Sequence, residues 1–250
     1  MTLKGAPGIV PAIDMPLGKA IPYIQRLKGS EDFVTGLKIG SDIIDNYGFY
    51  TAGHLLDDIE NELPIILDLQ KRGTDVPFMI KKQIGDAKRF GIAAYIGHPL
   101  GSGSNPDAVE PGEYGTTEAF VKYCQDAEIE PIVVLELTPP GATRFHREGA
   151  AEDLARTCKD LGVNFFVAPA TRPERIAVYR EIIGPEGRII SPGNGPQKTG
   201  NAEEDAKNAV RYGADDLVIG RALINSDDAV ATARAIYKAI VPVHAERLKA

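Results

Sequence analysis

The chain has 250 residues, of which 43% are hydrophobic, and its formal net charge is −7 at pH 7. It is long enough to bury a full core, and no apolar stretch approaches the roughly 18 residues of a membrane span. The acidic balance leaves no basic stripe that could displace counterions, which argues against nucleic acid as the main partner. A small phosphorylated ligand is compatible with this charge, since a local positive cluster can hold it.

The N-terminus and the two cysteines indicate the compartment. Residues 1–7 lack the longer apolar core of a signal peptide, so a cytoplasmic location is the expectation. Cys124 and Cys158 lie in helical patterns with neither zinc spacing nor a disulfide framework, and we expect reduced structural thiols. No stretch reads as a linker or a low-complexity segment, so residues 1–250 are predicted to form a single domain.

Short apolar runs that end in glycine, aspartate or a charged residue recur along the whole chain. Nearly every gap between them holds a helical pattern, such as residues 150–161, which Gly162 closes as a C-cap. Strands buried on both faces and separated by helices indicate a parallel sheet, and eight units in 250 residues match a closed α/β TIM barrel, (β/α)8. The eight predicted strands are Ile9–Asp14, Phe33–Ile39, Pro64–Leu69, Ile92–Gly97, Pro131–Leu137, Val163–Ala168, Arg188–Ser191 and Asp216–Ile219.

An open doubly wound sheet is the alternative fold. It usually carries Gly-x-Gly-x-x-Gly in its first βα unit, and that pattern is absent here. The glycine-rich loops instead follow the seventh and eighth predicted strands, where barrels commonly bind phosphate. The position of these loops therefore favours the barrel.

Two glycine-bearing turns form the strongest functional signal. The first, Ser191-Pro192-Gly193-Asn194-Gly195-Pro196-Gln197, follows the seventh strand, and Gly220-Arg221 follows the eighth. Such turns make backbone N–H groups available at adjacent strand ends, and the planar fork of Arg221 suits phosphate oxygens. Ordinary glycine-rich loops are the alternative interpretation, but the pair on consecutive units predicts a phosphate site.

Charged residues of both signs follow the other strand ends, where barrel enzymes carry their chemistry. Alternating lysine and aspartate could also be a solvated salt-bridge lattice. Four such residues converging beside a phosphate site favour a catalytic array instead. The rim residues are Asp14, Lys38, Asp68, Gln70, Lys71, His98 and Glu136 to Thr138.

At these residues the chain resembles the orotidine 5'-phosphate decarboxylase family, particularly its archaeal members. The resemblance covers nearly the whole chain and is strongest from Glu136 to Ala142, from Ala170 to Arg175 and at Gly220-Arg221. It implies decarboxylation of orotidine 5'-monophosphate to uridine 5'-monophosphate, in which a lysine protonates a carbanion-like pyrimidine carbon. The family uses no cofactor and no metal. A lysine ammonium held between aspartates offers positive charge where negative charge develops.

The resemblance also implies roles for individual residues. Gln197 and Arg221, with the backbone at Gly220, match the 5'-phosphate site, and Pro192 matches a residue that packs beside the pyrimidine. Thr138 stands where the family usually has a serine that hydrogen-bonds the base. The remaining matches, to the ribose-side acid and lysine, are Asp14 and Lys38.

The chain departs from the family after the third predicted strand. The family motif is Asp-x-Lys-x-x-Asp, whereas here Lys71 comes three residues after Asp68, and Asp75 follows four further on. In a regular strand Gln70 would share the face of Asp68 and Lys71 would point away. A bulge, helped by Gly73, could turn Lys71 inward as the proton donor. Otherwise another donor such as Lys38 would be needed.

The resemblance implies a homodimer, in which Asp75 contributes to the partner's site. Residues 76–79 offer an apolar patch beside Asp75, although Met79 replaces the threonine that usually reaches the neighbouring ribose. The segment 101–107 follows a strand end and could be a lid or a plain surface loop.

Two other functions stay open. Magnesium-dependent sugar-phosphate decarboxylases and hexulose-phosphate synthases share the barrel, but an acid in their second strand helps to hold the metal, and Lys38 occupies that place here. A nucleotide-binding paralogue could keep the phosphate and base contacts and have lost turnover through the altered strand-three loop.

Overall fold

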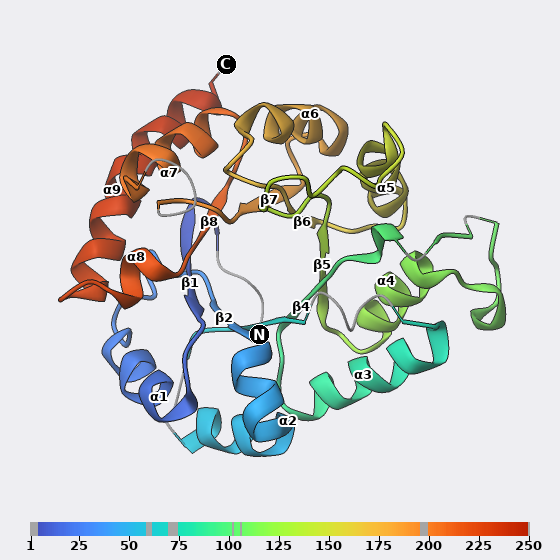
Figure 1. The fold of residues 1–250 in the computed structure, drawn as a ribbon, viewed down its shortest axis with the longest axis horizontal. Helices are drawn as coiled ribbons and strands as arrows, with labels where there is room; N and C mark the ends of the chain where they lie inside the picture. Colours follow the sequence, from blue (N-terminus) through green and yellow to red (C-terminus); the bar gives the residue numbers. More distant parts are fainter. Residues whose placement is uncertain are drawn as a thin grey trace.

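The computed structural model describes residues 5–58, 62–69, 75–101, 103–105, 107–195 and 200–249, with side chains described throughout except at 55–58. Its centre is a ring of parallel strands in which each strand pairs with the next and β1 pairs with β8 (Figure 1). The closed (β/α)8 barrel is therefore confirmed, and the open doubly wound sheet was the wrong alternative. The strands are β1 Gly8–Ile13, β2 Leu37–Gly40, β3 Ile65–Asp68, β4 Ala94–Gly97, β5 Glu130–Val134, β6 Phe165–Val167, β7 Arg188–Ser191 and β8 Asp216–Ile219.

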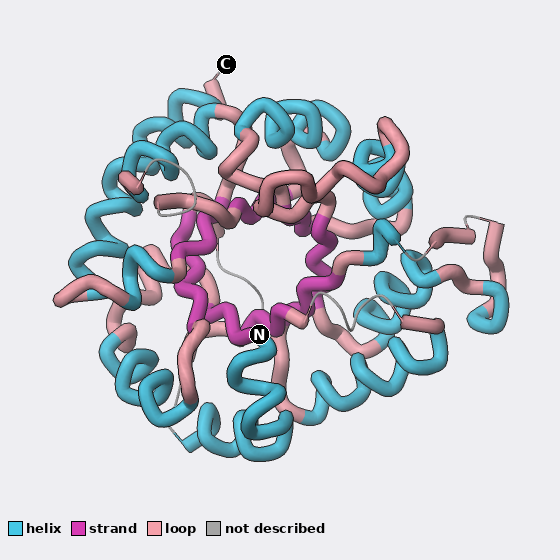
Figure 2. Tube along the Cα trace, in the orientation of Figure 1, coloured by secondary structure: helices cyan, strands magenta, loops and turns pink. Residues whose placement is uncertain are grey.

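Helices surround the strand ring on all sides (Figure 2). Among the described residues no helix is both long enough and apolar enough to cross a membrane. The helices are α1 Leu17–Arg26, α2 Ser41–Asp58, α3 Pro77–Arg89, α4 Thr116–Asp126, α5 Ala150–Asp160, α6 Pro173–Ile183, α7 Ala202–Arg211, α8 Arg221–Ile224 and α9 Ala229–Arg247, with single 3-10 turns η2 Pro99–Gly101 and η3 Pro111–Glu113.

Strand alternation divides the core into two layers. In β1, Ile9 and Ile13 face the helices, whereas Val10 and Ala12 point into the barrel. Both faces are buried, which is why the strands read as nearly continuous apolar runs. The barrel interior is filled by Val10, Ala12, Ile66, Ala94, Ile96, Ile132, Val134, Val167, Ile190 and Val218. The outer layer includes Cys124 and Cys158, which are free, buried thiols as expected.

The first six strand predictions extend beyond the observed strands, most of all the second at its start and the fifth at its end. Phe33 lies in a turn and Val34 forms an isolated bridge to Ile9, and the N–H groups of both donate to the carbonyl of Ser30 at 3.0 and 2.8 Å. Strand β5 ends at Val134, before Leu135 to Leu137. Local hydrophobicity cannot mark either boundary. Residues 33–39 and 135–137 are mostly apolar, and their polar members Thr35, Lys38 and Glu136 are buried as well.

A cluster of ion pairs closes the N-terminal end of the barrel. The carboxylate of Asp215, just before β8, accepts from Arg180 of α6 and Arg247 of α9. His244 Nε2 lies 3.4 Å from it, and the Ile189 N–H donates at 2.8 Å. Burial alone would raise the pKa of Asp215, but these partners outweigh it and lower the pKa to about 2.

The neighbouring Asp216 is also buried and paired. It accepts from Arg188 at the start of β7 and, at 3.3 Å, from the Thr35 hydroxyl. Burial nevertheless raises the pKa of Asp216 to about 6. Asp215 therefore joins the start of β8 to helices α6 and α9, and Asp216 joins it to β7 and to the segment before β2.

The loop between β4 and α4 is held at its base by a buried carboxylate. Glu118 accepts from the Ser104 hydroxyl and, at 2.9 Å, from the Asn105 N–H. The Thr117 hydroxyl donates to the Gly103 carbonyl at 3.1 Å. In Figure 1 this connection projects away from the barrel beside α4. Its described residues therefore form a surface loop, and the lid interpretation finds no support in them.

Candidate active site

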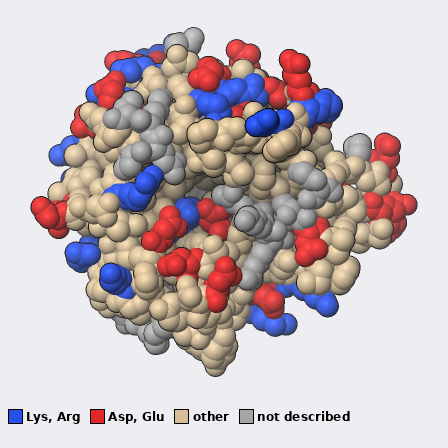
Figure 3. All heavy atoms as spheres, viewed as in Figure 1, with Lys and Arg blue, Asp and Glu red and all other residues tan. Residues whose placement is uncertain are grey.

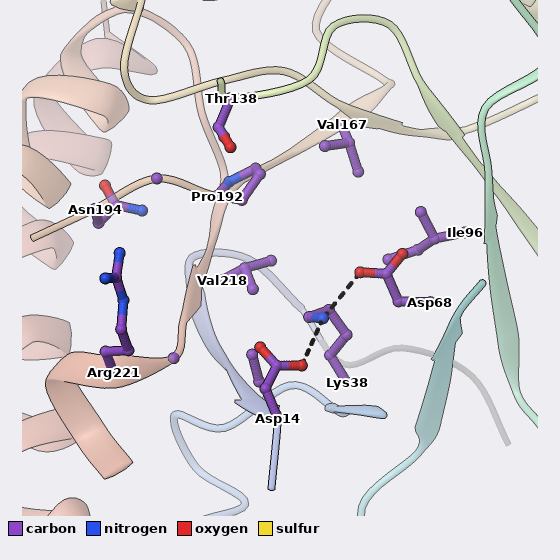
Figure 4. Close-up of a pocket in the computed structure, with 13 residues that line it drawn as sticks. Asp14, Lys38, Asp68, Ile96, Thr138, Val167, Pro192, Asn194, Val218 and Arg221 are labelled. Atoms are coloured by element: carbon purple, nitrogen blue, oxygen red, sulfur yellow. Dashed lines mark hydrogen bonds and ion pairs between the residues drawn. The ribbon is translucent and has the colours of Figure 1, made fainter. Parts of the chain in front are cut away.

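A cavity opens at the C-terminal ends of the strands, where Lys or Arg and Asp or Glu side chains meet near the centre of the face seen in Figure 3. The close-up in Figure 4 shows that the charged groups lie on opposite sides of it. The lining residues are Ala12, Asp14, Lys38, Asp68, Ile96, Thr138, Val167, Pro192, Gly193, Asn194, Val218, Gly220 and Arg221.

Lys38 is held between two carboxylates on one side of the cavity. Its Nζ lies 2.9 Å from Asp68 Oδ2 and 3.4 Å from Asp14 Oδ1 (Figure 4). The residue points inward because its neighbours Leu37 and Ile39 face the helices. Burial lowers the pKa of Lys38, but the two carboxylates outweigh it, and the pKa ends above its ordinary value. The lysine is therefore a fixed positive charge at neutral pH.

Asp68 ends β3 and uses only half of its carboxylate for this contact. Its Oδ1 is buried and has no hydrogen-bond partner within the described ranges. A buried carboxylate oxygen without a donor is costly, so this side of the site has capacity for one more donor. Two carboxylates share one described cation here, and the local charge is negative.

The opposite wall consists of the loops after β7 and β8. Gly193 and Gly195 have φ of 98° and 85°, a backbone region that favours glycine. The loop is pinned, since the Pro192 carbonyl accepts from the Ala170 N–H at 2.8 Å and the Gly195 N–H donates to Asp205 at 2.9 Å.

Arg221 begins α8 on the same wall. Its side chain is exposed and makes no ion pair or hydrogen bond with any residue whose structure is described. Guanidinium groups have donors only, so this arginine is available to an anion. The wall therefore carries unpaired positive charge across the cavity from the two carboxylates.

Thr138 lies between these two walls, and a network around Glu136 holds its segment. Glu136 is buried and accepts from Arg172 Nε at 3.2 Å, from Arg175 Nε at 2.5 Å and from the Tyr179 hydroxyl. The Thr171 hydroxyl donates to the Thr138 carbonyl at 3.2 Å. The chain after β5 is thus fixed by α6, although it has left the sheet.

The structure brings seven of the predicted site residues to this cavity: Asp14, Lys38, Asp68, Thr138, Pro192, Gly220 and Arg221. Asp75 is not among the lining residues. It is exposed before α3, where its Oδ1 accepts from the Val76 N–H at 2.7 Å. Lys71 and Gln197 lie outside the described residues. Strand β3 ends at Asp68, so the predicted bulge also lies outside the described residues.

Sequence reasoning did not single out the apolar part of the wall. Ala12, Ile96, Val167 and Val218 lie within predicted strands, and only their alternation with helix-facing neighbours could have identified them. His98 does not line the cavity, since its Nδ1 lies 3.0 Å from the Val134 carbonyl in an ordinary loop hydrogen bond. Burial lowers the pKa of His98.

Curated relatives are similar over most of the chain. An orotidine 5'-phosphate decarboxylase of Pyrococcus horikoshii is 36% identical over 234 residues, which cover 93% of this chain and 98% of that protein. One from Methanococcoides burtonii is 31% identical, and the match covers 82% of this chain and 85% of that protein.

The fold also matches solved structures. The crystal structure of orotidine 5'-monophosphate decarboxylase from Methanocaldococcus jannaschii complexed with inhibitor BMP superposes with a TM-score of 0.74. It is 23% identical and covers 94% of this chain and 99% of that chain, which shows a shared barrel. The model of the orotidine 5'-phosphate decarboxylase / HUMPS family matches residues 7–236. The chain belongs to this family.

Proposed function

We propose that this protein is a carbon–carbon lyase that decarboxylates orotidine 5'-monophosphate to uridine 5'-monophosphate in pyrimidine nucleotide biosynthesis. The observation that carries the proposal is the buried ammonium of Lys38 between Asp68 and Asp14, across one cavity from Arg221, which pairs with no described residue. A phosphorylated ligand with a polar ring and a reacting carbon fits this distribution of charge. The names of the relatives point to the same substrate.

The nucleotide binds through its remote phosphate. Arg221 and the backbone at Gly220 hold the phosphate together with Gln197, and Pro192 packs beside the pyrimidine. Thr138 hydrogen-bonds the base, and Asp14 with Lys38 faces the ribose. Fixing the phosphate orients the reacting carbon, so that binding energy contributes to rate as well as to affinity.

In the reaction the bond between the pyrimidine ring and the carboxylate breaks, and carbon dioxide leaves. The electron pair stays on the ring carbon, which Lys71 then protonates. The negative carboxylates of Asp68 and Asp14 keep the ammonium of Lys38 charged before substrate arrives. This positive charge stabilises the developing carbanion. No cofactor or metal takes part in the proposed reaction.

The assignment of the proton to Lys71 is supported by the carboxylate of Asp68. Its unpartnered Oδ1 is the acceptor that a second ammonium requires, while Lys38 already bonds two carboxylates. Lys71 is three residues from Asp68, which is close enough for the chain to return its side chain toward that oxygen.

Homodimerisation and a cytoplasmic location belong to the same proposal. Asp75 is exposed, and Val76 and Phe78 beside it are 50% and 62% exposed, which offers an apolar surface to a second copy. In the dimer Asp75 completes the partner's site.

The magnesium-dependent alternative is disfavoured by Lys38, since its ammonium occupies the space between the two carboxylates that a divalent ion would need. The non-catalytic paralogue differs only in turnover. Absorbance after addition of orotidine 5'-monophosphate separates them: metal-independent loss of substrate supports the proposal, and tight binding of uridine 5'-monophosphate without turnover supports the paralogue.

The decisive variant is Lys71→Ala, followed by single-turnover decarboxylation and by binding of uridine 5'-monophosphate. Carbon dioxide release should be abolished while product affinity stays within a modest factor, because the ammonium acts mainly on the carbanion. Lys88→Ala is the matched control, since Lys88 is exposed and, within the described part of the chain, pairs with Glu128 at 3.4 Å. Near-wild-type turnover by Lys71→Ala would overturn the assignment.

A further inference from the structure

The loop after β7 contains a buried amide with one unused group. Asn194 is 6% exposed, and its Nδ2 donates to the Ser191 carbonyl at 2.9 Å. Because a carbonyl only accepts, this contact fixes the orientation of the amide and leaves Oδ1 on the other side. That oxygen is buried and has no hydrogen-bond partner in the part of the chain that the structure describes.

The backbone around Asn194 is poorly able to move to relieve this. Pro192 on one side and Gly195 on the other are each tied to neighbouring elements by a main-chain hydrogen bond. An apolar side chain of similar size would occupy the position without an unsatisfied acceptor. The polar side chain therefore has a cost at this position unless a further donor reaches its oxygen.

Arg221 has the complementary deficiency. It has five N–H donors and no partner among the described residues, and it lines the same wall as Asn194 (Figure 4). An acceptor without a donor and a donor group without an acceptor thus lie on one side of one cavity. The amide is neutral, so it can orient the guanidinium without cancelling its charge, whereas a carboxylate would repel an incoming phosphate.

We propose that Asn194 is a positioning residue for the phosphate monoester of the substrate, acting through Arg221. When the dianion draws Arg221 against the wall, Asn194 Oδ1 accepts one N–H group, and the remaining donors of the fork face the phosphate. The inference rests on the proposed function and adds to it a residue that reads the phosphate indirectly.

A double-mutant cycle with Asn194→Leu and Arg221→Ala tests this coupling. Asn194→Leu should weaken the binding of uridine 5'-monophosphate by about 10-fold and raise the KM for the substrate by a similar factor, with little change in kcat. Inhibition by uridine, which lacks the phosphate, should stay unchanged. In the Arg221→Ala background the same substitution should have no further effect. If Asn194 had a purely structural role, its substitution would weaken the binding of both ligands alike and would lower kcat as well.

Asn46→Leu is the matched control, because the Asn46 amide also donates to a main-chain carbonyl, that of Asp42 at 2.6 Å. It should leave both ligands unaffected. Where Asn194→Leu does not fold, Asn194→Ala takes its place in the cycle. The inference is wrong if the affinity losses from the two substitutions are additive, or if Asn194→Leu weakens uridine as much as the nucleotide. In either case the proposed function still stands, provided that the wild-type protein turns over substrate. Wild-type protein that neither binds nor decarboxylates the nucleotide overturns both.

Discussion

Both ends of the barrel carry aspartates that pair with cations, but the aspartates differ in how completely they are paired. At the N-terminal end Asp215 faces two arginines, a histidine and a backbone N–H. At the C-terminal end Asp68 shares one lysine with Asp14 and keeps an unpartnered oxygen among the described residues. A saturated cluster stabilises the fold, whereas an incomplete one can receive a ligand or another catalytic group.

The largest expected effect is on catalysis, from Asp68→Asn. We expect kcat to fall by on the order of 10³- to 10⁴-fold, about 4 to 5.5 kcal/mol, because one of the two charges that hold Lys38 is removed. The free energy of unfolding should change by only about 1 kcal/mol, since the amide oxygen still accepts from Lys38 and Asp14 keeps its charge. Steady-state kinetics and denaturant unfolding measure the two effects. If Asp68→Asn lowers the free energy of unfolding strongly but leaves the kcat of the folded protein unchanged, Asp68 is structural like Asp215 and the two ends of the barrel do not differ in role.

The converse variant is Asp215→Ala. It should lower the free energy of unfolding by about 3 to 5 kcal/mol, because Arg180, Arg247 and His244 lose the carboxylate that compensates them. Activity per folded molecule should be unchanged. Urea unfolding followed by circular dichroism, with active-site titration, checks both statements. A stable but inactive variant would contradict the structural role of this end.

Arg221→Ala removes a cation of the cavity that has no partner among the described residues. The KM for the nucleotide should rise on the order of 100-fold, about 3 kcal/mol of transition-state stabilisation, as a charge-assisted phosphate contact is lost. Stability should stay within about 0.5 kcal/mol, because no described residue pairs with this side chain. Arg211→Ala, at an exposed arginine 3.7 Å from Glu204, is the control. Unchanged kinetics would remove the phosphate assignment.

The smallest effect concerns pH. The folded pKa of Asp215 is lowered from 3.8 to about 2, so its contribution to stability is present above the unfolded pKa and is lost as pH falls from about 4 to about 2. The shift corresponds to about 2 kcal/mol. The destabilisation caused by Asp215→Ala should therefore be largest above pH 4 and shrink in acid. A constant difference between the two unfolding curves at pH 2.5 and pH 6 would show that the low pKa is wrong.

The barrel and the location of its site follow from local patterns in the sequence. Eight apolar runs separated by helical patterns predict a parallel sheet covered by helices, and the position of the glycine-rich loops favoured the closed barrel over the open doubly wound sheet. The predicted bounds of β7 and β8 agree with the structure. The glycine-bearing turns after these strands could be recognised from the sequence, because residue type and the order of segments along the chain are read from it directly.

Only the tertiary structure decided which charged residues share a contact. Lys38 meets Asp14 and Asp68 because β1, β2 and β3 pair in register, with Lys38 opposite Ala12 and Ile66. The network around Glu136 likewise depends on elements far apart in the chain. Apolar periodicity determines that a segment is a strand and which face it buries. Ion pairing depends on distances of a few ångströms between segments, which closure of the barrel alone sets.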